Sequence, residues 1–124
     1  MIPVPSLAAG IFLGLLAVAL PAAAQPAPSF LATCGELRAS LDKLGHVEEL
    51  TTIAVRGTLT LAEMQGPLAY MAVCSAPYPQ VLCITYGLSG RKVGEEVILT
   101  GALSRVGPDH VMLDPCLNSP PDTP

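Results

Sequence analysis

A change of hydrophobic period at Gly45 constrains the fold of this 124-residue chain more than any other feature. Before Gly45, apolar residues recur every three or four positions, which is the period of a helix. After Gly45 they alternate with polar residues in short runs separated by Gly and Pro, as in strands and turns. No later segment could serve as a crossover helix, so the pattern favours a small barrel or a curled meander over a βαβ fold.

One amphipathic helix is expected over about residues 30–44. Its apolar side chains are spaced four and three residues apart: Phe30, Cys34, Leu37, Leu41 and Leu44. Ser29 or Thr33 can cap the helix, since Thr33 and Glu36 have the spacing of a capping box, and Gly45 suits its end. We expect the apolar face to enter the open end of a barrel.

Five short strands are expected after the helix. They cover about residues 53–61, 68–74, 80–86, 97–105 and 110–113, with turns between them. In the first strand the inward face is expected to be Ile53, Val55, Gly57, Leu59 and Leu61. Gly57 and Gly101 lie inside strands, where they fit bulges or bends at which a sheet curls toward closure. The predicted fold class is mainly β, a five-stranded barrel or curled meander with an N-terminal helix.

Three segments resemble the OB-fold, a five-stranded barrel: residues 55–59, 94–101 and 110–116. They supply a glycine in the first strand, a Gly-acidic start to the fourth and an apolar last strand. Small exported bacterial OB-fold proteins of the BOF type also place a helix before the barrel. The resemblance covers about residues 50–117 and implies an OB-like barrel. Many OB-folds insert a helix between strands three and four, whereas residues 87–96 leave room only for a turn.

The first two dozen residues predict export. Leu7–Leu20 is almost wholly apolar, Pro21 ends it, and Ala22–Ala24 form a small-residue cleavage site before Gln25. The mature protein is therefore expected in the periplasm or outside the cell, with no membrane insertion after cleavage. Two alternatives remain open: a retained anchor, or a lipid on Cys34, because the preceding residues resemble a bacterial lipobox.

The chain is expected to contain a single folded domain. A signal peptide covers residues 1–24, a proline-rich spacer 25–28, the helix and barrel 29–117, and a disordered tail 118–124. Removing the signal leaves about 100 residues, enough for one hydrophobic core.

Four cysteines in an exported chain of this length predict two disulfides. Local pairing favours Cys74 with Cys83 across a turn, and Cys34 with Cys116 to tie the helix to the end of the barrel. Other pairings remain open, because four cysteines can pair in three ways. A zinc or thioredoxin-like site is not expected, because the chain has no Cys-x-x-Cys pair.

The charges do not point to nucleic acid or to enzymatic chemistry. Six Lys and Arg stand against ten Asp and Glu, a net charge of −4 that does not attract phosphate backbones or anionic lipids. His110 and Asp114 alternate on one strand face, but two ordinary ligands do not make a metal site. His46, Glu48–Glu49 and Glu95–Glu96 are expected to be solvated. With no catalytic motif present, we expect no enzyme, no cofactor and no metal.

The OB-fold resemblance implies a ligand surface on the second and third strands and nearby loops. The residues available there are Tyr70, Tyr78, Tyr86, Arg91 and Lys92. The expected function is therefore an exported, disulfide-stabilised, non-catalytic binding or accessory domain of the cell envelope, with a protein or small ligand. Two alternatives are a secreted inhibitor or interaction module that presents the loop at 75–82, and a lipid-anchored envelope protein.

Overall fold

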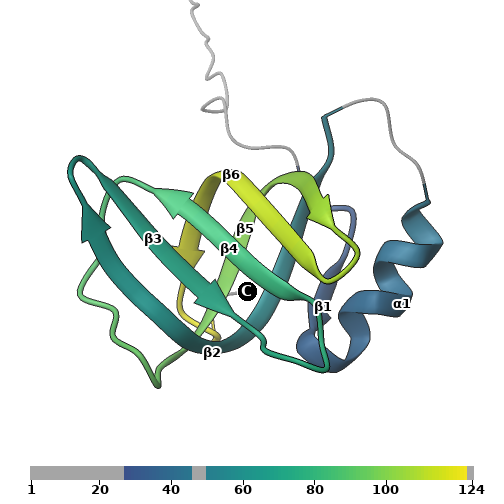
Figure 1. Cartoon of the computed structure of the whole chain (residues 1–124), viewed down its shortest axis with the longest axis horizontal. Helices are drawn as coiled ribbons and strands as arrows, with labels where there is room; N and C mark the ends of the chain where they lie inside the picture. Colours follow the sequence, from purple (N-terminus) through teal and green to yellow (C-terminus); the bar gives the residue numbers. More distant parts are fainter. Residues whose placement is uncertain (1–26, 46–49, 123–124) are drawn as a thin grey trace, which may run out of the picture.

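The computed structural model describes residues 27–45 and 50–122, which form one helix and six strands (Figure 1). In chain order these are β1 (Leu31–Thr33), α1 (Cys34–Leu44), β2 (Thr52–Gln65), β3 (Leu68–Val73), β4 (Gln80–Thr85), β5 (Glu96–Gly107) and β6 (His110–Ser119). The expected signal peptide, the acidic pair Glu48–Glu49 and His46 lie outside the described residues.

Five of these strands close into a barrel in the order β2-β3-β4-β6-β5, with β5 pairing back to β2. The long strand β2 makes closure possible, because Thr52–Thr58 pair with β5 and Leu59–Gln65 pair with β3. β4 and β6 are parallel, whereas the other barrel pairs are antiparallel. This order and closure confirm the prediction of a five-stranded, OB-like barrel.

Helix α1 lies at one end of the barrel, beside β1 (Figure 1). Thr33 is its N-cap, and the Thr33 backbone N donates to Glu36 Oε1 at 3.0 Å, as the capping-box spacing predicts. The helix ends at Gly45, whose φ of 69° suits glycine. The helix begins later than its apolar pattern indicates, because residues 31–33 form β1 and pair in parallel with β2.

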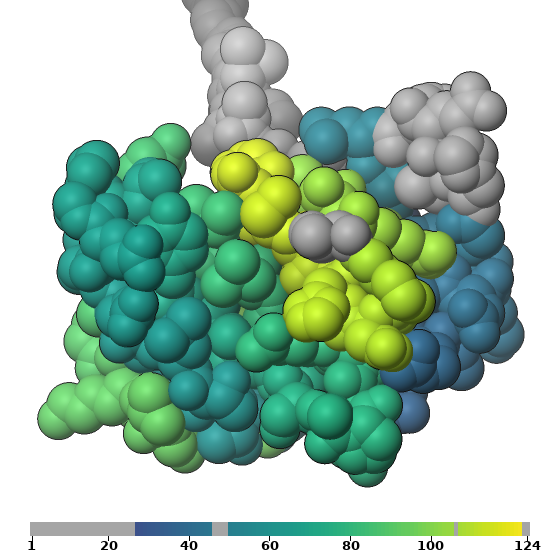
Figure 2. Space-filling view, in the orientation of Figure 1, coloured from purple at the N-terminus to yellow at the C-terminus, as the bar shows by residue number. Residues whose placement is uncertain are grey.

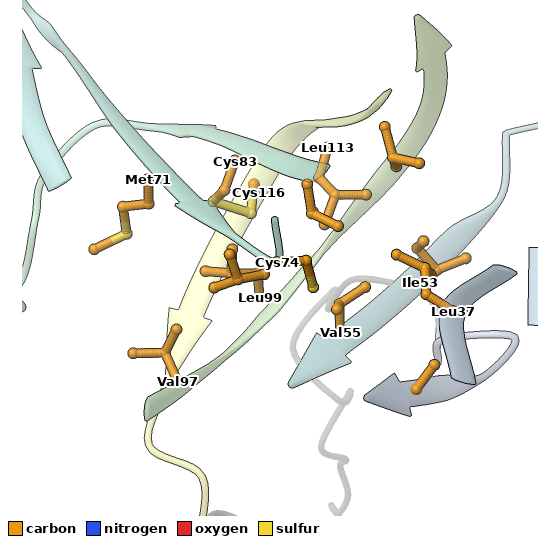
Figure 3. Close-up of a cluster of buried hydrophobic side chains, with 14 of the residues drawn as sticks. Leu37, Ile53, Val55, Met71, Cys74, Cys83, Val97, Leu99, Leu113 and Cys116 are labelled. Atoms are coloured by element: carbon orange, nitrogen blue, oxygen red, sulfur yellow. A yellow bond between two sulfur atoms is a disulfide. The ribbon is translucent and has the colours of Figure 1, made fainter. Parts of the chain in front are cut away.

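The core fills the barrel and extends beneath the helix (Figure 3). Leu37 and Leu41 from α1 are buried against it, as expected for a helix that covers the barrel end. The main departure from the predicted core is Leu61. A register shift between Leu59 and Leu61 adds a residue to β2, so Leu61 pairs with Ala72 on the outer surface instead of pointing inward.

The structure contains the two predicted disulfides, but their pairing was predicted wrongly. Cys34 is bonded to Cys74, and Cys83 to Cys116. Cys74 does not face Cys83, because the residue opposite Cys83 on β3 is Met71. Cys74 has a φ of 71°, which turns its side chain inward, where its sulfur bonds to Cys34 of the helix.

The bridges have two further consequences. Two disulfides in so short a chain indicate an oxidising, non-cytoplasmic compartment. The sulfur of Cys34 is also bonded to Cys74, whereas the alternative of a lipid on Cys34 requires that sulfur to be free.

Two glycines lie where other atoms come close to the glycine Cα: the backbone of β6 in one case and a disulfide in the other. A Cβ on Gly101 would meet the Pro115 carbonyl oxygen and lie 2.9 Å from the Cα of Cys116. A Cβ on Gly57 would lie 3.1 Å from Cys34 Sγ. The register of β5 shifts just after Gly101, which agrees with the expected irregularity there.

The last strand is longer than its apolar run indicates. β6 pairs with β5 as far as Ser119, opposite Ile98. The strand therefore includes the first two residues of the segment 118–124 that was expected to be a tail.

Candidate functional site

The outer surface of β2, β3, β4 and β6 carries several apolar side chains, and Figure 2 shows the side of the molecule on which these strands lie. The strand registers align one row of residues across the four strands: Leu61, Ala72, Leu82 and Met112. A second row, two residues further along, begins with Glu63, Tyr70 and Ile84. We call these two rows the outer face.

The first row forms a shallow apolar cleft with a volume of about 200 Å³. Its walls are Leu61, Ala72, Leu82 and Met112, with Gln80, His110 and Val111 at one side. The flanking side chains leave Ala72 only 1% exposed, although it points away from the barrel interior. We refer to this hollow as the apolar cleft.

A second cleft, of about 230 Å³, lies at the C-terminal end of β4. It is lined by Leu68, Ile84, Thr85, Tyr86, Asp114 and Pro115. Tyr86 is 79% exposed, so its ring is largely open to solvent beside an exposed carboxylate. We refer to it as the Tyr86–Asp114 cleft.

The structure separates the residues that were expected to share a ligand surface. Tyr70 lies on the outer face. Tyr86 lies at the border of the outer face, just after the C-terminal end of β4. Tyr78 lies two residues before the N-terminal end of β4, in the loop that connects β3 to β4. Arg91 and Lys92 lie in the loop between β4 and β5 and not on a strand of the outer face.

Sequence reasoning missed the apolar part of the outer face. Met112 was placed with His110 and Asp114 on a strand face expected to be solvated, and the faces occupied by Leu82 and Ile84 were not considered. A signal was present, because strands β4 and β6 carry apolar residues on both faces. The bulge that turns Leu61 outward could not be recognised in the sequence, because the alternation of β2 continues through Leu61.

The loop of residues 75–79 forms a separate feature beside the helix. Arg38 of α1 donates from Nη2 to the Pro77 carbonyl at 3.2 Å and to Asp109 Oδ1 at 2.9 Å. The backbone N of Gln80 donates to the Asp109 carbonyl at 2.9 Å. These contacts hold the loop against α1 and the turn between β5 and β6, and they leave Tyr78 47% exposed.

The arginine side chains are directed away from the outer face. Arg56 pairs with Glu96 at 3.2 Å, and the hydrogen bond to that carboxylate raises the pKa of Arg56. Arg91 Nε donates to Asn118 Oδ1 at 3.2 Å, and Arg105 Nη2 donates to the Leu41 carbonyl at 2.8 Å.

Residues 27–45 and 50–122 contain no cluster of three or more His, Cys, Asp or Glu side chains that could hold a metal ion. Within these ranges, no helix reaches the length and hydropathy of a membrane span.

Comparisons with known proteins add little to this geometry. Neither a protein-family profile nor a curated protein matches the sequence. Among solved structures, the chain is similar to the crystal structure of the S. pombe Stn1-ten1 complex, with a TM-score of 0.40 and 8% identity. That match covers 55% of this chain and 57% of the other, so this chain spans little more than half the length of the structure it matches. The OB-like assignment rests on the strand order and closure described above.

Proposed function

We propose that this chain is an exported, non-catalytic binding or accessory domain of the bacterial cell envelope, of the BOF type, and that it binds its ligand on the outer face. The observation that carries the proposal is the apolar cleft. Apolar side chains gathered in a shallow hollow, rimmed by polar residues, are typical of interaction sites. The strands that form it include the pair on which OB-folds bind their ligands.

The two bridges and the helix serve this function by holding the barrel rigid. A rigid surface loses little conformational entropy when a ligand binds. Cys83–Cys116 joins β4 to β6, two adjacent strands of the outer face. The clefts between these strands are therefore held in place by a covalent bond inside the barrel.

Site-specific photo-crosslinking in the exporting cell tests the proposal. A benzophenone amino acid placed at Leu82 should give defined adducts on irradiation. The same residue at Thr58, an exposed β2 position outside the outer face, should give none. Adducts of equal yield at both positions, or none at Leu82, would count against a ligand surface on the outer face.

Export is tested by the mass of the mature protein. A chain that begins at Gln25 and is four hydrogens lighter than its reduced form would support signal cleavage and two bridges. A chain that retains residues 1–24 would instead support a membrane anchor.

A second candidate function is a secreted inhibitor or interaction module that presents the loop at 75–82. It is favoured by the exposed Tyr78 between two prolines and by the contacts of Arg38 with Pro77 and Asp109, which brace the loop. Tyr78→Ala separates the two candidates, since an inhibitor should lose its target while a ligand on the outer face should bind as before.

A further inference from the structure

We propose that the outer face binds an extended, cationic peptide segment in which an apolar side chain stands two residues from a Lys or Arg. This inference rests on the proposed function and specifies the ligand of the same surface. The apolar cleft would take the apolar side chain, and the Tyr86–Asp114 cleft would take the cation.

The spacing of the two clefts matches an extended chain. Leu82 lines the apolar cleft and Ile84 lines the Tyr86–Asp114 cleft, and both side chains point outward from β4. Residues two apart on a strand lie roughly 7 Å apart on the same face. An extended peptide that runs along β4 has the same interval between alternate side chains, so neighbouring side chains on one of its faces reach both clefts.

The charge of the outer face selects a cation. The protein has six Lys and Arg, and none of them belongs to β3, β4, β6 or residues 57–65 of β2. Glu63 lies beside Tyr70 at one border, and Asp114 lies beside Ile84 at the other. Within residues 27–45 and 50–122, neither carboxylate forms an ion pair. Phosphate backbones would meet only negative charge here, and a second copy would bring like charges together.

The Tyr86–Asp114 cleft provides two kinds of attraction for a Lys or Arg side chain. The carboxylate of Asp114 attracts the charge directly, and the face of the Tyr86 ring attracts a cation through its quadrupole. The methylene stem of the basic side chain can pack on Ile84 and Leu68 in the same cleft.

Three fluorescein-labelled peptides with blocked ends test the proposal by fluorescence anisotropy with the exported protein. The probe is Arg-Thr-Leu-Thr-Arg, which presents a cation on either side of the apolar residue and therefore fits in both chain directions. One control replaces both arginines by Glu, and the other replaces Leu by Ser. The probe should bind at least tenfold more tightly than either control, and 0.5 M NaCl should weaken its binding.

Matched variants locate the two interactions on the protein. Asp114→Asn should weaken probe binding roughly threefold, whereas the same change at the exposed helix residue Asp42 should have no effect. Tyr86→Ala should also weaken binding roughly threefold, whereas Tyr78→Ala at the far end of β4 should not. All four positions are exposed, so the variants are expected to keep the fold.

Backbone amide shifts from NMR, recorded with each peptide, separate the possible failures. If the Glu peptide shifts amides of β3 and β4 as much as the probe does, the cationic ligand is wrong and the proposed function stands. If no peptide shifts them, the peptide ligand is wrong, and crosslinking at Leu82 against Thr58 then decides whether the proposed function stands. Equal weakening by Asp42→Asn and Asp114→Asn would overturn the inference, because net charge alone would then explain binding. A concentration-dependent dimer that Leu82→Asp dissociates would overturn it by assigning the outer face to a second copy.

Discussion

Gly101→Ala should destabilise the protein more than any other single methyl addition to a described glycine. The new Cβ would lie 2.9 Å from Cys116 Cα and 3.0 Å from Leu113 Cβ, and it would also meet the Pro115 carbonyl oxygen. Carbon atoms in good contact are about 3.5–4.0 Å apart, so β5 and β6 must separate. Backbone atoms cannot rotate away as a long side chain can.

The expected loss can be worked out from this crowding. Overpacking in a well-filled site costs about 1–3 kcal/mol. Separation of β5 from β6 also weakens the ladder around the pair of Gly101 with Cys116, at about 1 kcal/mol for each hydrogen bond lost. We therefore expect the free energy of unfolding to fall by about 3 kcal/mol. This is a large part of the roughly 5–15 kcal/mol that is typical of a small domain.

Urea unfolding of the oxidised protein, followed by far-ultraviolet circular dichroism, measures the change. With a urea dependence of about 1.5 kcal/mol per molar, the midpoint should fall by roughly 2 M. Gly107→Ala is the matched control on the same strand, because a Cβ there would have no neighbour within 4 Å. The reasoning is refuted if the midpoints of the Gly101 and Gly107 variants agree within about 0.5 M, by the same urea dependence.

Three further predictions concern the helix and its attachments. Gly35→Ala should raise the free energy of unfolding by about 0.5–1 kcal/mol in the same urea assay, because Gly35 is an exposed helix residue with open space around it. Arg38→Met should lower it by less than about 1 kcal/mol, because the ion pair with Asp109 is exposed; a larger loss would show that the loop contacts dominate. The double change of Cys34 and Cys74 to Ser should lower it by about 4 kcal/mol on the loop-entropy account, and peptide mapping of the unsubstituted protein should recover these two cysteines in one disulfide-linked fragment pair.

Local patterns were sufficient to predict the helix, the barrel and the number of bridges. Capping residues and period-2 alternation are set by neighbours in the chain, and Thr33 and Gly45 terminate α1 as their types indicate. Three errors arose where the chain departs from its local pattern. The bulge after Leu59 moves Leu61 outward, the positive φ of Cys74 turns that side chain inward, and β1 forms only because β2 offers it an edge.

The candidate site was harder to predict because it depends on neighbours that are distant in the chain. Tyr70 was assigned to the ligand surface from its place on the second barrel strand. Its neighbour Ile84 and the carboxylate of Asp114 reach the same face only through the pairing of β3 with β4 and of β4 with β6. Tyr78 and Tyr86 look equivalent in the sequence, yet β4 places them beyond its opposite ends.

The order of the bridges along the chain determines how the domain can be divided. Cys34–Cys74 closes one stretch and Cys83–Cys116 closes the next, and neither spans residues 75–82. A cut inside either closed stretch leaves one covalent molecule. A cut within residues 75–82 would instead give two separately cross-linked pieces, held together by the β2–β5 and β3–β4 ladders and the buried core. The bridges therefore divide the domain into two halves, one containing α1 and β1–β3 and the other β4–β6, which only noncovalent contacts would join after such a cut.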